Sequence, residues 1–86
     1  MIPIARPSVG AAEAAAASAT ILSGWLTQGS ETGAFEREFA AAVGSSHACA
    51  VMNCTAALHL ALLSVGVQPG HEVITVSHSF IATANA

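Results

Sequence analysis

The chain has 86 residues, which is enough for one domain at most. Its formal net charge is −3, and the absence of lysine leaves no basic stripe of the kind that nucleic-acid binding requires. Hydrophobic residues make up 53% of the chain and charged residues 8%, which excludes an ordinary self-contained domain and leaves a membrane protein, an obligate interface or a piece of a larger fold.

The amino-terminal stretch is expected to be an extended arm followed by a helix. Pro3 and Pro7 resist helix formation, so residues 1–7 are predicted to be extended. The Ala-rich segment 9–22 favours a helix, with Ser8 as its candidate cap. Gly24 is expected to end it and to open the loop "SGWLTQGS".

A second helix is predicted from the end of this loop to about residue 43. Ser30 or Thr32 is its candidate cap, and Gly44 is expected to close it. Apolar side chains recur at a spacing of four and predict one apolar face: Phe35, Phe39 and Val43.

The second half of the chain alternates between strand-like and helix-like segments. Segments 47–52 and 72–76 are predicted to be short buried strands, and residues 55–65 between them a helix. From Phe80 onward the chain looks helical again. This order predicts an α/β fold with parallel strands. Two parallel strands cannot bury both faces of a sheet, so the chain looks like the opening of a larger α/β domain.

The membrane alternative rests on residues 39–70, which contain no Asp, Glu, Lys or Arg and are long enough to span a bilayer. Polar side chains such as Asn53 and His59 interrupt this window, and no basic anchors flank it. The amino terminus has no signal-peptide pattern. We therefore expect a cytoplasmic protein without a membrane segment, in which Cys49 and Cys54 are reduced and buried.

Two polar hinges follow the predicted strands: "NCT" at 53–55 and "SHSF" at 77–80. Ligands in open α/β folds bind beyond the carboxyl ends of the strands, and a helix start offers N–H groups and a partial positive charge that suit a phosphate. At "NCTAA" the N–H groups of Thr55 and Ala56 and the Thr55 hydroxyl are the candidate donors. The alternative is that Thr55 or Asn53 only caps the helix. Neither common nucleotide fingerprint is present.

A metal site is the other reading of the polar residues in this half. Two histidines and two cysteines are candidate ligands: His47, Cys49, Cys54 and His59. Their spacing matches no zinc-binding pattern, so the sequence predicts no metal site.

Several segments, in this order, closely resemble the amino-terminal part of the DegT/DnrJ/StrS sugar aminotransferases: "SGWLTQG", "TAALHLAL", "GVQPGHEVI" and "FIATANA". These are pyridoxal-phosphate enzymes with the aspartate-aminotransferase fold, fold type I. The resemblance implies that the chain is the amino-terminal portion of a large α/β domain with an incomplete sheet. The arm and two helices would occupy residues 1–44, and the first strand–helix–strand unit residues 45–86.

The resemblance also implies roles for individual residues. Thr55 and Ala56 match the segment that holds the phosphate of pyridoxal 5'-phosphate, and Phe80 matches the aromatic that stacks on the pyridine ring. An apolar aromatic at a strand exit is chemically suited to cover a flat ring, although a core aromatic is the alternative. Trp25 and Thr27 match a loop near the active site and are expected to approach the substrate or a partner subunit, with a packed loop as the alternative.

The implied reaction moves an amino group from glutamate to a keto group on a nucleotide-linked sugar, for polysaccharide biosynthesis or antibiotic sugars, in a homodimer. Transamination needs a lysine that forms a Schiff base with the cofactor, and this chain contains none. We therefore assign no catalytic residue and expect the 86-residue chain to be inactive by itself. The competing hypothesis is a non-catalytic fragment or pseudo-enzyme.

Overall fold

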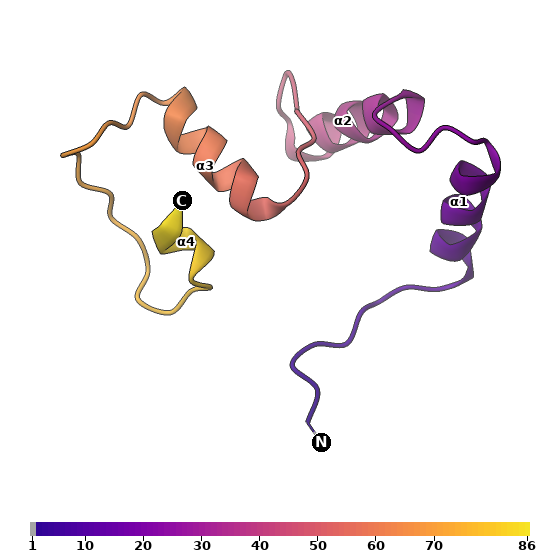
Figure 1. The fold of residues 1–86 in the computed structure, drawn as a ribbon, viewed down its shortest axis with the longest axis horizontal. Coiled ribbons are helices and arrows are strands. Elements are labelled where there is room, and N and C mark those ends of the chain that lie inside the picture. Colours follow the sequence, from indigo (N-terminus) through magenta and orange to yellow (C-terminus); the bar gives the residue numbers. More distant parts are fainter. Residues whose placement is uncertain (1) are drawn as a thin grey trace. The chain divides into compact units, whose positions relative to one another are not determined.

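The computed structural model describes residues 2–86, and in this range the chain forms four helices (Figure 1). They are α1 (Ala11–Leu22), α2 (Ser30–Val43), α3 (Cys54–Ser64) and α4 (Ala82–Asn85). The chain divides into two compact units: the first ends at Ala48 and contains α1 and α2, and the second, Cys49–Ala86, contains α3 and α4.

Helix α1 forms because its sequence is Ala-rich, and it begins two residues later than predicted. Its cap is Gly10 and not Ser8, so the predicted cap was wrong. The physical reason is a hydrogen bond of 2.7 Å from the Gly10 N–H to Oε2 of Glu13, the reciprocal half of a capping box. Hydrogen bonds from the backbone N–H groups of Glu13 itself and of Gly10 hold the pKa of this exposed carboxyl below its ordinary value.

Helix α2 runs from Ser30 to Val43, and Gly44 closes it, as predicted. Gly44 has φ 70°, a left-handed conformation that costs a glycine little. The cap at the other end is Gly29, so the predicted caps, Ser30 and Thr32, were wrong. The apolar face is confirmed: the rings of Phe35 and Phe39 lie side by side with centroids 5.8 Å apart.

Helix α3 begins and ends one residue earlier than predicted, and a glycine turn follows it. Gly66 has φ 78°, and the Val67 N–H returns to the carbonyl oxygen of Leu62 at 3.1 Å. This bond satisfies one of the carbonyl groups that the end of a helix leaves without an intrahelical donor. Helix α4 is a short turn that begins two residues after Phe80.

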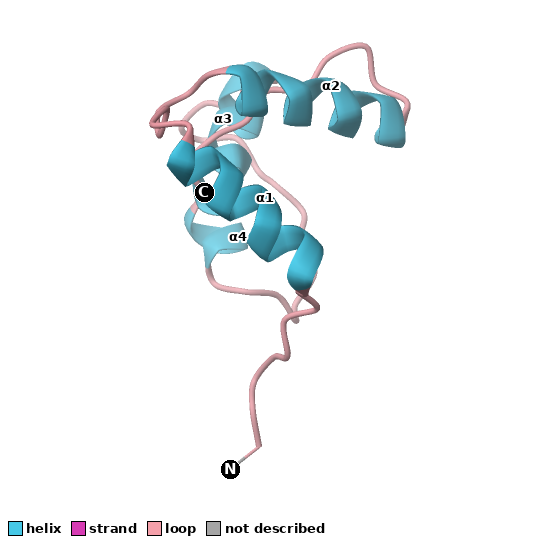
Figure 2. Ribbon diagram, turned by 90° about the vertical axis from the view of Figure 1, so that its right-hand side faces the viewer, coloured by secondary structure: helices cyan, strands magenta, loops and turns pink. Residues whose placement is uncertain are grey.

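The prediction of strands at 47–52 and 72–76 was wrong for residues 2–86. Both segments are irregular, and residues 2–86 contain helices and loops but no strand (Figure 2). A strand persists only when a neighbour pairs with its backbone N–H and C=O groups, and parallel strands in particular depend on several neighbours. The chain therefore has the helices of the predicted α/β pattern without its sheet.

Hardly any apolar surface is buried within the described residues. Ala40 and Ala82 are the only buried hydrophobic residues there, at 7% and 8% exposure. Cys49 and Cys54 are free thiols and both are exposed, so the prediction that they are buried was wrong. The reason is the same in each case: within residues 2–86 no sheet forms and no element packs over these segments.

The charge-free window at 39–70 is not one helix. It is divided among the end of α2, an irregular segment and α3. Along the described chain, residues 2–86, no helix has the length and apolar character needed to cross a membrane.

Candidate functional site

The start of α3 is built around the side chain of Asn53. Its backbone is extended, and its Oδ1 accepts a hydrogen bond of 2.8 Å from the N–H of Ala56. The first intrahelical bond runs from the Ala57 N–H to the Asn53 carbonyl oxygen at 3.1 Å. The cap interpretation is therefore confirmed for Asn53, and Thr55 is not the cap.

The donors at this helix start fit a phosphate only in part. The N–H groups of Cys54 and Thr55 precede the first intrahelical bond, so they have no acceptor within the helix. Thr55 is exposed and adds a hydroxyl, whereas Ala56 is half-buried and its N–H is already bonded to Asn53. A phosphate that used both predicted amides would have to displace the Asn53 side chain from Ala56.

Phe80 lies in the second hinge, immediately before the turn that leads into α4. Its side chain is 78% exposed, so it is not a core aromatic in this structure. The backbone around it is held locally: the Phe80 carbonyl oxygen accepts from the Thr83 N–H at 3.0 Å, and the hydroxyls of Ser79 and Thr83 are 2.7 Å apart. The Phe80 side chain therefore extends from a hydrogen-bonded turn with most of its surface exposed.

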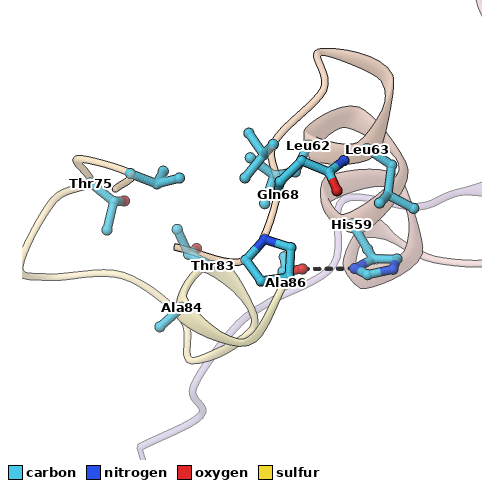
Figure 3. A pocket seen from close by; sticks show the side chains of 11 residues that line it. His59, Leu62, Leu63, Gln68, Thr75, Thr83, Ala84 and Ala86 are labelled. Atoms are coloured by element: carbon cyan, nitrogen blue, oxygen red, sulfur yellow. Dashed lines mark hydrogen bonds between the residues drawn. The ribbon is translucent and has the colours of Figure 1, made fainter. Parts of the chain in front are cut away.

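A pocket of about 620 Å³ lies in the second unit, where α3 and α4 contact each other (Figure 3). Its lining is mostly apolar and includes Leu62 and Leu63 of α3. The ring nitrogen Nδ1 of His59 and the carbonyl oxygen of Ala86 are 2.7 Å apart beside it. Thr55, Ala56 and Phe80 do not line this pocket, so it is separate from the predicted cofactor residues.

The loop between α1 and α2 contains the other two predicted residues, Trp25 and Thr27. The indole Nε1 of Trp25 donates a hydrogen bond of 3.2 Å to the Gln28 carbonyl oxygen, which folds the ring back over the loop. A Cβ built on Gly29 would overlap this indole. Sequence reasoning treated Gly29 only as a loop residue; the signal that it missed is the aromatic four positions before a helix-capping glycine.

The predicted site residues are divided between the two units. Thr55 and Ala56 lie in the first turn of α3 and Phe80 in the hinge before α4, all three in the second unit. Trp25 and Thr27 are in the first unit. In the part of the chain that the structure describes, no group of three or more His, Cys, Asp or Glu side chains is placed to hold a metal ion.

Residues 7–86 match the DegT/DnrJ/EryC1/StrS aminotransferase family, a range that includes both hinges and the Trp25 loop. The chain is also similar to the spore coat polysaccharide biosynthesis protein SpsC of Bacillus subtilis (strain 168), with 49% identity over 84 residues. The match covers 98% of this chain but only 22% of SpsC. No solved structure matches the chain.

Proposed function

The chain belongs to the DegT/DnrJ/EryC1/StrS aminotransferase family, and from this premise we propose that it supplies part of a pyridoxal 5'-phosphate site in an enzyme that aminates sugars. The family depends on pyridoxal phosphate, has fold type I and acts on sugar substrates. The chain spans 22% of the length of SpsC, so the proposed activity is that of a longer protein to which this chain contributes one part.

The single observation that carries this proposal is the start of α3. Thr55 places an N–H group without an intrahelical acceptor and a hydroxyl on an exposed surface, next to the small residue Ala56. Backbone N–H groups and the positive end of the helix dipole together favour a phosphate at such a place. Thr55 and Ala56 are therefore the proposed phosphate ligands.

Phe80 is the proposed platform for the cofactor ring. Its 78% exposed side chain and its position in the hinge before α4 leave it available for stacking. When bound, pyridoxal phosphate supplies an electron sink for reactions at the amino-bearing carbon. The residues of this chain then bind and orient it: Thr55 and Ala56 at the phosphate, Phe80 at the ring.

Trp25 and Thr27 are proposed to approach the substrate or a partner subunit. Both are exposed, in a loop whose shape is held by the hydrogen bond from Trp25 to Gln28. The proposed donor is glutamate and the proposed acceptor a nucleotide-linked keto sugar, handled by a homodimer. The name of SpsC, a polysaccharide biosynthesis protein, supports a sugar destined for a polysaccharide.

A second candidate function is non-catalytic, and the composition favours it for the 86-residue chain alone. Transamination depends on a lysine that this chain lacks. We expect the isolated chain to produce no amino sugar from glutamate and a nucleotide-linked keto sugar in the presence of pyridoxal phosphate. Formation of an amino sugar in that assay would contradict the assignment of a purely non-catalytic role to the isolated chain.

The phosphate site is tested on the chain by NMR titration with pyridoxamine 5'-phosphate, which has no aldehyde to condense with the amino terminus. Addition is expected to shift the amide signals of Thr55 and Ala56, whereas pyridoxamine without the phosphate should leave them in place. Thr55→Glu should abolish the shifts, because its carboxylate repels the phosphate while still suiting a helix start. Thr20→Glu in α1 makes the same charge change elsewhere and should preserve them.

Three results would contradict the proposed site. The first is an absence of shifts at Thr55 and Ala56 in the parent chain. The second is an equal response to pyridoxamine without phosphate, which would mean that the phosphate is not recognised. The third is an unchanged response in Thr55→Glu, which would place the phosphate elsewhere.

A further inference from the structure

The loop between α1 and α2 is closed by hydrogen bonds at both ends. At its beginning, the Ser23 hydroxyl donates to the Thr20 carbonyl oxygen at 2.7 Å and accepts from the Trp25 N–H at 3.2 Å. At its end, the Trp25 indole donates to the Gln28 carbonyl oxygen at 3.2 Å. Thr27 lies between these two closures, so its position depends on both.

The second closure occupies the space where Gly29 would carry a side chain. A Cβ at Gly29 would overlap the indole Nε1 of Trp25 and would lie 2.7 Å from its Cδ1. The backbone of Gly29 has φ −164°, an extended conformation open to any residue, so the need for glycine is spatial and not conformational. Among the glycines described, Gly29 alone has a neighbour this close.

We propose that Gly29 is a positioning residue, whose missing side chain lets the Trp25 indole close the loop and so fixes where Thr27 is presented. A side chain at Gly29 pushes the indole outward and releases the Gln28 carbonyl oxygen. The assignment of Thr27 to the substrate side rests on the proposed function, whereas the closure of the loop does not depend on any ligand.

The indole of Trp25 reports this closure directly, because it is the only tryptophan in the chain and there is no tyrosine. A nitrogen-15-labelled chain therefore gives a single indole N–H signal. In the parent chain this signal should be shifted from that of a free indole, and its exchange with water should be slowed. Loss of one hydrogen bond corresponds to an exchange rate about fivefold higher.

Gly29→Ser is the sharpest variant, because serine is a good helix cap and adds only the Cβ and a hydroxyl. It is expected to raise the indole exchange rate about fivefold and to shift the Thr27 amide, while the helical circular dichroism signal is kept. Gly33→Ala is the matched control: its Cβ would meet only the guanidinium end of Arg37 at 3.4 Å. That variant should leave the indole signal unchanged.

A double-mutant cycle separates positioning through Trp25 from a general effect at Gly29. Trp25→Leu should shift the Thr27 amide as Gly29→Ser does, and adding Gly29→Ser to Trp25→Leu should cause little further shift. The proposal is overturned if the parent indole exchanges like a free one, or if Gly29→Ser leaves it unchanged. Additive shifts in the cycle, or an equal indole response to Gly33→Ala, would overturn it too.

Discussion

The N–H of Ala56 is a donor that two acceptors would share. Asn53 Oδ1 accepts it at 2.8 Å, and the proposed cofactor phosphate would use the same group. A cap and a phosphate site are therefore in competition at this atom, although both depend on the same unsatisfied helix start. The sequence predicted Asn53 as a cap and Ala56 as a donor separately. That the Asn53 side chain accepts from the Ala56 N–H depends on the extended backbone of Asn53, which only the structure shows.

Asn53→Ala tests this competition because it removes the cap and frees the Ala56 N–H. Helix α3 should lose about 1 kcal/mol of stability, seen as weaker helical circular dichroism. Pyridoxamine 5'-phosphate should restore more helix in this variant than in the parent, since it no longer displaces a side chain. Asn53→Ser keeps a capping oxygen and should behave like the parent; an equal ligand response in Asn53→Ala and the parent would show that the cap and the ligand do not compete.

Glu13 provides a prediction about pH. Its pKa is held below the ordinary value of 4.5 by hydrogen bonds from its own backbone N–H and from the Gly10 N–H. Because the folded pKa is depressed, the carboxylate stabilises the start of α1 above the unfolded pKa, and this contribution is lost as the pH falls through the folded pKa. The Gly10 amide signal in NMR should therefore titrate with a midpoint below 4.5.

Glu13→Gln is the control for this titration, because glutamine keeps an oxygen acceptor at the third helical position but carries no charge. In this variant the Gly10 amide should not follow the titration of residue 13. A midpoint at or above 4.5 in the parent chain would mean that the hydrogen bond to Gly10 does not favour the ionised carboxyl.

At the scale of elements, the three longer helices could be predicted from the sequence and the strands could not. Helix formation depends on local propensity and end residues, so α1, α2 and α3 lie within two residues of their predicted bounds. A strand at 47–52 or 72–76 depends on partners that local sequence does not supply. The caps Gly10 and Gly29 were not predicted because each depends on a side chain elsewhere in the loop or helix: Glu13 bonds to Gly10, and the Trp25 indole fills the space beside Gly29.

A glycine-to-alanine substitution is expected to change the stability of α2 in opposite directions at two positions. Gly33 is in the helix interior, so Gly33→Ala should stabilise α2 by up to about 1 kcal/mol. Gly44 closes the helix with φ 70°, so Gly44→Ala should destabilise it by about 1 kcal/mol. Helical circular dichroism as a function of temperature measures both changes; the same sign for the two variants would contradict the assigned end of α2.

For the whole molecule, the exposed apolar surface is considered together with the match to SpsC. Side chains typical of a core are exposed in both units, for example Phe39 at 49% and Ile74 at 101%. Their sequence is that of a family member over nearly the whole chain, but the chain spans only 22% of SpsC. The exposure agrees with the composition, which predicted that these segments pack against neighbours.

A chimera with SpsC tests whether this chain supplies the phosphate end of a family cofactor site. The 84 matched residues replace their counterparts in SpsC, and pyridoxal phosphate retained through gel filtration is measured by its visible absorbance against unaltered SpsC. We predict that the chimera retains pyridoxal phosphate. Thr55→Glu should lower the affinity for the cofactor at least about tenfold, because it places a negative charge at the phosphate, whereas Thr20→Glu should leave the affinity unchanged. Two results would contradict this prediction. One is a chimera that folds but loses the cofactor while SpsC retains it; the other is a Thr55→Glu chimera whose affinity for the cofactor is unchanged.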